Sequence, residues 1–140
     1  MEVMSTLAPV ASAQRRLALP AVADVVALCV FVAIGRSSHD EAGSLTGFVT
    51  TLWPFLCGAI VGWAATAALR RGRSFTPAAL WPAGVIVWVS TVVVGMVLRV
   101  VSGQGTALSF CIVASIATAV LLLGWRAVAA AVGRRRISAS

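Results

Sequence analysis

Residues 85–98 read VIVWVSTVVVGMVL, an apolar run that contains no charged side chain. With its neighbours on either side, the apolar segment extends over residues 77–101. At a helical rise of about 1.5 Å per residue, a segment of this length crosses the hydrocarbon core of a bilayer, which is about 30 Å thick. The segment therefore predicts a transmembrane helix over residues 77–101.

Three further apolar stretches predict helices of the same kind over residues 17–35, 45–69 and 107–128. Pro54 lies inside the second of these stretches and predicts a helix kink there, because proline removes one backbone hydrogen bond. Neighbouring helices can satisfy the carbonyl that is freed in this way. Residues 1–14 and 131–140 are expected to be cytoplasmic tails, the first mobile and the second basic.

The composition indicates the same class of protein. Of the 140 residues, 60% are hydrophobic and 11% are charged, whereas about a quarter of the residues in a soluble domain are charged. So few charges cannot cover a surface that faces water. We therefore predict an all-α integral membrane protein, a four-helix bundle of two helical hairpins with residues 15–130 as its transmembrane domain. Richness in Ala, Val, Gly and Arg is typical of a high-GC bacterium, so the expected location is the plasma membrane.

The basic side chains are distributed unevenly about the predicted helices, and all except His39 are arginines. The side of a membrane protein that is richer in arginine and lysine faces the cytoplasm. One side carries Arg15, Arg16, Arg70, Arg71, Arg73, Arg134, Arg135 and Arg136, and the other carries Arg36 and Arg99. We therefore expect both termini in the cytoplasm. The expected partners are the bilayer and anionic lipid headgroups at the cytoplasmic face, and not nucleic acid.

Two charged residues fall inside the predicted membrane segments at similar depths. Asp24 lies roughly 10 Å into the first helix, and Arg126 lies roughly 12 Å from Arg134 along the fourth. A charge at this depth is costly and usually faces a partner or a wet cavity. Our hypothesis is that Asp24 and Arg126 form an intramembrane ion pair between these helices. Two alternatives stay open: Arg126 extends to the headgroups by itself, or Asp24 belongs to a proton or ion relay.

Small residues predict close contacts between helices. Gly58 and Gly62 form a small-xxx-small motif, which lets two helix backbones approach closely. Gly95 lies on a face of the third predicted helix that also carries Thr91. The motif predicts packing inside the bundle, and self-association through the Gly58–Gly62 face is the second interpretation.

The outer bends of the two predicted hairpins carry three further polar side chains at or near them, Arg36, His39 and Arg99. We treat these as a hypothetical outer-face polar cluster. His39, Asp40 and Glu41 are adjacent in the chain and cannot readily converge on one metal ion, so no metal site is expected there. The three cysteines match no metal-binding spacing and are interpreted as free thiols. No cofactor is expected.

The tryptophans have two interpretations. Trp81 and Trp125 fall near the predicted inner interface, where tryptophan commonly anchors a helix. Trp53, beside Pro54, would instead line a ligand pocket at the predicted kink.

Four short motifs resemble a known family: residues 35–39 (GRSSH), 53–55 (WPF), 95–99 (GMVLR) and 123–126 (LGWR). The chain resembles, over about residues 17–128, the domain of unknown function 3054 family, short prokaryotic multi-pass membrane proteins that are frequent in actinobacteria. The resemblance implies a small helical membrane protein and supplies no activity. It also implies that the shared pattern includes Arg36, His39, Trp53, Pro54, Arg99, Trp125 and Arg126.

No catalytic motif is visible, since the chain has no recognisable nucleophile arrangement, phosphate loop or dinucleotide fingerprint. We therefore expect a protein that is not an enzyme. The favoured function is structural or accessory, through helix contacts with further copies of the chain or with a larger membrane complex. The alternative is a small oligomeric transporter or channel that uses Asp24.

Overall fold

A computed structural model describes residues 2–37, 44–69 and 77–139. The described residues form four long helices and a short kinked segment, η1, ahead of the third, and they contain no strand. These elements are α1 (Glu2–Ser37), α2 (Leu45–Leu69), η1 (Leu80–Gly84), α3 (Val85–Val101) and α4 (Leu108–Ala139).

Each long helix supplies a segment that is long and apolar enough to cross a membrane. The four candidate spans are Ala18–Ser37, Leu45–Leu69, Leu80–Val101 and Leu108–Ala139. The protein is therefore an all-α, multi-pass membrane bundle of four helices, as the sequence predicts.

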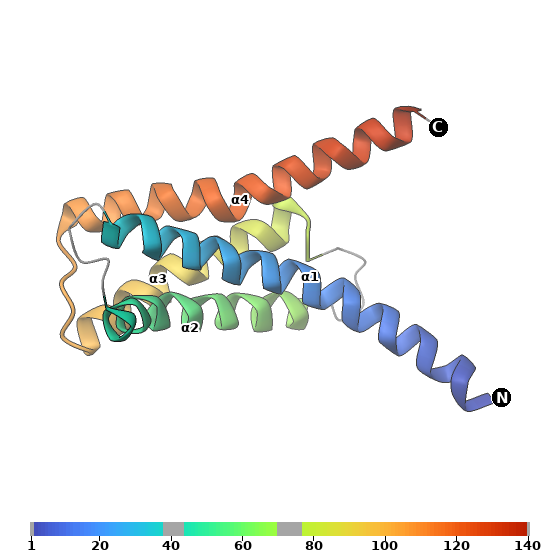
Figure 1. The fold of residues 1–140 in the computed structure, drawn as a ribbon, viewed down its shortest axis with the longest axis horizontal. Helices are drawn as coiled ribbons and strands as arrows, with labels where there is room; N and C mark the ends of the chain where they lie inside the picture. Colours follow the sequence, from blue (N-terminus) through green and yellow to red (C-terminus); the bar gives the residue numbers. More distant parts are fainter. Residues whose placement is uncertain (1, 38–43, 70–76, 140) are drawn as a thin grey trace.

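The helices form a ring in which α1 contacts α2 and α4, and α3 contacts the same two helices. Both chain termini lie at the same end of the bundle (Figure 1). The predicted hairpins are both present, but the most extensive contact joins them to each other, through α2 and α3. The bundle is therefore built around its two middle helices rather than around two independent hairpins.

Glycines make the close approach of α2 and α3 possible. A Cβ atom added to Gly58 would lie 2.7 Å from the Cα atom of Thr91, and one added to Gly62 would lie 2.8 Å from that of Val87. Gly95 faces the same interface, where an added Cβ would lie 2.9 Å from Cδ1 of Phe55. The predicted packing role of these glycines is confirmed. Self-association through the Gly58–Gly62 face is excluded in this fold, because α3 occupies that face.

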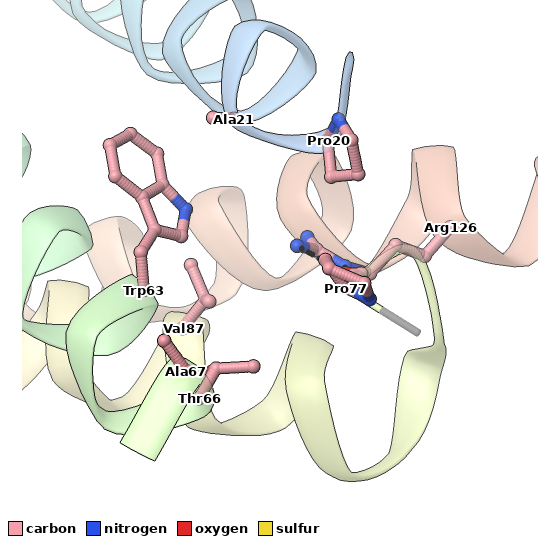
Figure 2. Close-up of a pocket in the computed structure, with 8 residues that line it drawn as sticks. All are labelled: Pro20, Ala21, Trp63, Thr66, Ala67, Pro77, Val87 and Arg126. Atoms are coloured by element: carbon pink, nitrogen blue, oxygen red, sulfur yellow. Dashed lines mark hydrogen bonds between the residues drawn. The ribbon is translucent and has the colours of Figure 1, made fainter. Parts of the chain in front are cut away.

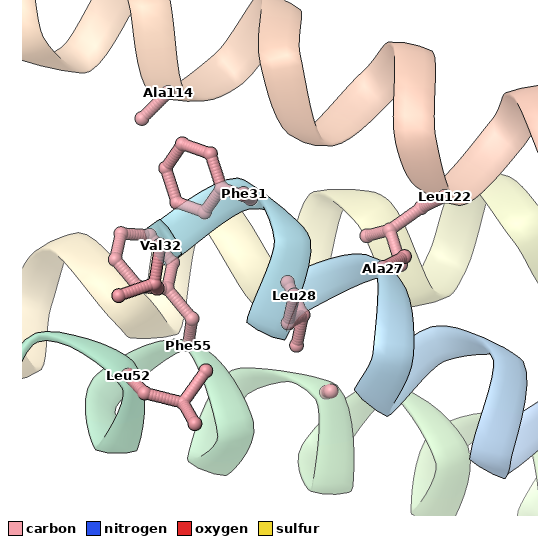
Figure 3. Close-up of a cluster of buried hydrophobic side chains, with 9 residues drawn as sticks. Ala27, Leu28, Phe31, Val32, Leu52, Phe55, Ala114 and Leu122 are labelled. Atoms are coloured by element: carbon pink, nitrogen blue, oxygen red, sulfur yellow. The ribbon is translucent and has the colours of Figure 1, made fainter. Parts of the chain in front are cut away.

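Aromatic and aliphatic side chains from α1, α2 and α4 pack together inside the bundle (Figure 3). Phe55 of α2 is fully buried and meets Phe31 of α1 edge to face, with ring centroids 5.2 Å apart. The ring centroid of Phe55 also lies 6.5 Å from that of Phe110. The buried cluster comprises Ala27, Leu28, Phe31, Val32, Leu52, Phe55, Ala59, Ala114 and Leu122.

Both terminal helices continue beyond the predicted apolar segments. The backbone of residues 2–14, expected to be a tail, is a continuation of α1, and α4 runs on through residues 131–139. These extensions leave the bundle at one end and diverge from each other (Figure 1). Alanine and arginine are strong helix formers, so α4 continues as a helix beyond the end of the apolar segment. The mobility of the first tail stays a prediction.

The third predicted helix needs a correction at its start. Regular helix does not begin at Pro77, and Trp81 has extended backbone angles (φ −125°, ψ 132°) that interrupt the helical path. The residue before a proline is disfavoured in the helical region, and Pro82 follows Trp81. By contrast, α2 continues through Pro54, which is buried. The bend predicted at Pro54 stays a prediction.

Candidate functional site

The predicted ion pair between the first and last helices is present. Asp24 and Arg126 are buried, with exposed side-chain fractions of 0% and 1%. Nη1 of Arg126 donates to Oδ1 of Asp24 at 2.7 Å, and Nη2 donates to Oδ2 at 2.9 Å. A two-pronged contact of this kind has the planar geometry that favours arginine with a carboxylate. Arg126 therefore does not extend to the headgroups, and that alternative is wrong.

Two indole groups complete the surroundings of the carboxylate. Nε1 of Trp125 donates to Oδ1 of Asp24 at 2.9 Å, and Nε1 of Trp63 donates to Oδ2 at 3.0 Å. Each carboxylate oxygen thus accepts two hydrogen bonds, which uses the acceptor positions that an ionised carboxylate offers. Trp125 is half-buried and its indole N–H points to Asp24, a contact that the sequence did not predict. Its role as an interfacial anchor stays a prediction.

The role of Trp63 was missed by reasoning from the sequence. One signal was available. Asp24 lies as many residues from Ala18 as Trp63 lies from Leu69, and at these two residues the first and second spans end on the same side of the bundle. Matching depths along helices could have placed the two residues at one level. Depth alone does not show which way around the helix axis a side chain points.

Arg126 is equally well supplied with acceptors. Besides the carboxylate, Nη1 donates to the carbonyl oxygen of Leu122 at 3.0 Å, while Nε and Nη2 each donate to that of Pro77 at 3.2 Å. A guanidinium group has five N–H donors, and each of them has a partner here. The guanidinium carbon also lies 4.4 Å from the centroid of the Trp125 ring. We call Asp24, Trp63, Trp125 and Arg126 the buried polar centre.

The buried polar centre joins α1, α2, α4 and the segment before η1. A buried ion pair is tolerated only when its geometry is good and its remaining donors and acceptors are satisfied, and both conditions are met. No acceptor or donor position is left over for a metal ion or a reacting group. Within residues 2–37, 44–69 and 77–139, no group of three or more His, Cys, Asp and Glu side chains could hold a metal ion. The arrangement is chemically suited to clamping helices together.

A cavity of about 210 Å³ adjoins the buried polar centre (Figure 2). Arg126 and Trp63 contribute to its wall, whereas Asp24 is not among the wall residues. The wall consists of Pro20, Ala21, Trp63, Thr66, Ala67, Pro77, Val87 and Arg126. This cavity lies beside Trp63, and not beside Trp53 and Pro54, where the sequence suggested a pocket.

The two outer arginines have separate surroundings. Nη1 of Arg36, at the end of α1, donates to Oγ1 of Thr51 in α2 at 3.3 Å. Arg99, at the end of α3, donates through Nε and Nη2 to the carbonyl oxygen of Gly105 and through Nη1 to Oε1 of Gln104. His39 lies outside the described residues. The structure thus shows each arginine with its own partners, and the predicted outer-face polar cluster stays a prediction.

Arg99 organises the turn between α3 and α4. Its exposed fraction is 8%, and its guanidinium carbon lies 4.3 Å from the centroid of the Phe110 ring. The backbone N–H of Gln104 in turn donates to the carbonyl oxygen of Arg99 at 2.8 Å. The Gln104 side chain reaches across to α2, where it donates to the carbonyl oxygen of Thr50 at 3.1 Å. Arg99 therefore fixes one end of the bundle, as the buried polar centre fixes the other.

Four membrane-crossing helices held together by a buried acid–arginine pair define a small multi-pass membrane protein whose first and last spans are bound to each other. A family model described as "Protein of unknown function (DUF3054)" matches residues 21–129, and the chain belongs to this family. The matched range contains all four residues of the buried polar centre. A search of curated proteins and a search of solved structures found no match.

Proposed function

We propose that this chain is a structural or accessory protein of the bacterial plasma membrane and not an enzyme. It acts through helix contacts with further copies of itself or with a larger membrane complex, with both termini in the cytoplasm of a high-GC bacterium. The observation that supports this proposal is the state of Asp24, whose carboxylate is fully buried and accepts four hydrogen bonds. A side chain so completely engaged serves best as a fixed point of the fold.

Transport would make different demands on the same carboxylate. Intramembrane acids that carry protons or ions face water-filled pathways and exchange their partners during the cycle. Asp24 would have to break its contacts with Arg126 and with two indole groups before it could bind a cation. Each of those contacts is made inside a medium in which an unpaired charge is very unfavourable. The geometry therefore supports the structural role over the transporter or channel.

The outer surface offers apolar rows for contacts within the membrane. On α1 an exposed row follows the four-residue spacing of one helix face and comprises Val22, Val26, Val30 and Ile34. On α4 a second exposed row comprises Leu108, Ile112, Ile116 and Val120. Beyond that row, α4 continues past the bundle (Figure 1). Its last turns carry the exposed residues Arg134, Arg135 and Arg136, whose charge suits anionic lipid headgroups. These surfaces are the ones we expect lipids and protein partners to contact.

The decisive experiment removes every ionisable group from the buried polar centre and leaves neutral, polar amides in their place. In the double variant Asp24→Asn with Arg126→Gln, two amides replace the ion pair. The variant is compared with the unchanged protein in two assays: complementation of a strain that lacks the gene, and ion currents across vesicles that contain purified protein under proton or sodium gradients.

If the protein is structural, the unchanged protein and the double variant should complement the deletion about equally well. Vesicles that hold the unchanged protein should carry no more current than empty vesicles. Asp24→Asn alone is the matched control, since it leaves the Arg126 cation buried without a counter-ion. Current from the unchanged protein that disappears in the double variant would establish the transporter or channel instead.

A further inference from the structure

The cavity beside the buried polar centre is large enough to hold a guest. Its volume is about 210 Å³, whereas an engineered cavity of about 150 Å³ in another protein admits benzene. All four long helices face it or border it: Pro20 and Ala21 from α1, Thr66 from α2, Val87 from α3 and Arg126 from α4. An empty space of this size would deprive its lining of dispersion contacts.

The polar atoms in the wall are already engaged elsewhere. Oγ1 of Thr66 donates to the carbonyl oxygen of Gly62 at 2.8 Å, and Nε1 of Trp63 donates to Asp24. The five N–H groups of Arg126 are satisfied by Asp24, Leu122 and Pro77, as described above. A buried water needs two to four polar partners, and the N–H and O–H groups of these side chains have none left to give. The guest that matches this wall is apolar.

The position of the cavity indicates where an apolar guest comes from. Ala67 is exposed, and Ala21, Trp63 and Pro77 are half-buried, so the cavity reaches the outer surface of the bundle. Ala21 and Ala67 lie inside the membrane spans Ala18–Ser37 and Leu45–Leu69. At this level the surrounding solvent is the hydrocarbon of lipid chains.

We propose that the cavity holds the acyl chain of one membrane lipid from the leaflet nearer the termini. The acyl chain fills the space between α1, the C-terminal end of α2 and the start of α3. The buried polar centre forms the adjoining wall and makes no bond to the lipid headgroup. The lipid is thus a bound component of the bundle. This inference is separate from the proposed function, because a structural protein or a transporter could hold such a lipid.

The test counts lipids that remain bound when the full-length protein is released from bilayers into the gas phase of a native mass spectrometer. The bilayers contain phosphatidylglycerol, phosphatidylethanolamine or phosphatidylcholine with identical acyl chains. Ala21→Leu places a larger side chain in the cavity, and Ala33→Leu is the matched control, because Ala33 is an exposed alanine of α1 outside the cavity. Ala67→Leu and Ala68→Leu form a second such pair on α2.

We expect the unchanged protein and both controls to retain one lipid with any of the three headgroups, and the cavity-filling variants to retain at least about fivefold less. Equal retention by filled and control variants would show that the retained lipid sits elsewhere, and would overturn the proposal. Retention of phosphatidylglycerol alone would show that a headgroup is recognised, with the same consequence. If neither filling variant assembles, the unchanged protein still provides the test. If it retains no lipid from any of the three kinds of bilayer, the proposal of a bound acyl chain is rejected.

Discussion

Asp24 and Arg126 stand 102 positions apart in the sequence, yet two parallel hydrogen bonds of 2.7 and 2.9 Å join their side chains in the buried interior of the bundle. This contact closes the ring of helices by fastening the first to the last.

Removing one partner of the ion pair should destabilise the protein strongly. Asp24→Ala or Arg126→Ala leaves the opposite charge buried and unpaired, which typically costs about 3–5 kcal/mol. Exchanging the charges, with Asp24→Arg and Arg126→Asp together, should recover only part of that loss, because the N–H groups of Trp63 and Trp125 would then face a cation. Reversible unfolding in mixed detergent micelles measures the free energy of unfolding. If the single variants unfold like the unchanged protein, the pair contributes nothing.

Each indole that serves the carboxylate should have a measurable effect of its own. Trp63→Phe and Trp125→Phe each remove one donor to Asp24, and a hydrogen bond to a charged group contributes roughly 1.5–3 kcal/mol. Trp53→Phe is the matched control, since no hydrogen bond of its indole occurs among the described contacts. The same unfolding assay should also show that Trp125→Phe loses most of its effect once Asp24 is changed to Asn. Additive effects would mean that the indole acts through packing alone.

The glycines between α2 and α3 should not tolerate even one methyl group. Gly58→Ala and Gly62→Ala place a Cβ within 3 Å of the α3 backbone, and overpacking of this kind typically costs about 1–3 kcal/mol. In Gly124→Ala the new atom meets nothing within 4 Å, so the higher helix propensity of alanine should leave stability unchanged or raise it by up to about 1 kcal/mol. Melting temperatures in detergent distinguish the variants. Equal behaviour of Gly58→Ala and Gly124→Ala would contradict the close approach.

Arg99 should govern the exchange of backbone amides in the turn between α3 and α4. Lysine at this position keeps the charge but cannot reproduce the forked contacts with Gln104 and Gly105. Losing about 1.4 kcal/mol of local stability raises amide exchange about tenfold. Hydrogen–deuterium exchange with mass spectrometry should show this increase in peptides covering residues 102–106 and no comparable change around Trp63. Unaltered exchange in the turn would remove Arg99 from its organising role.

The orientation in the membrane is open to direct labelling. In a variant without the native cysteines, a single cysteine at Gln104 should react with an impermeant maleimide in intact cells. One at Ser138 should react only after the inner membrane is opened, because the arginine-rich ends are expected to remain inside. The two positions lie at opposite ends of α4 and its preceding turn. Labelling of Ser138→Cys from outside would reverse the proposed orientation.

Hydropathy predicted the helices well where the membrane determines their extent. The second span was predicted as residues 45–69, the bounds of α2, and α3 ends at Val101, where the third predicted span ends. Outside the membrane, hydropathy no longer indicates whether the backbone is helical. The extension of α4 to Ala139 was therefore not predicted. The break at Trp81 depends on a local steric conflict with Pro82, which hydropathy does not detect.

The buried polar centre was only half predictable for a related reason. Depth along a helix follows from counting residues, so Asp24 and Arg126 could be placed at one level. Rotation about each helix axis depends on how the glycines of α2 fit against α3, and that rotation determines that Trp63 points to Asp24. The cavity depends on the same packing and leaves no mark in the sequence.

The pairing of the first helix with the last has a consequence for biosynthesis. A ribosome makes the chain from its N-terminus, so Asp24 enters the bilayer long before Arg126 has been translated. Until the final helix arrives, Asp24 lacks the arginine that pairs with it in the finished bundle, and of the donors that the structure describes around it Trp63 alone has been made. A chain that terminates early would keep that defect permanently, and cellular proteases that survey the membrane would have a chemical difference by which to tell the fragment from the finished product.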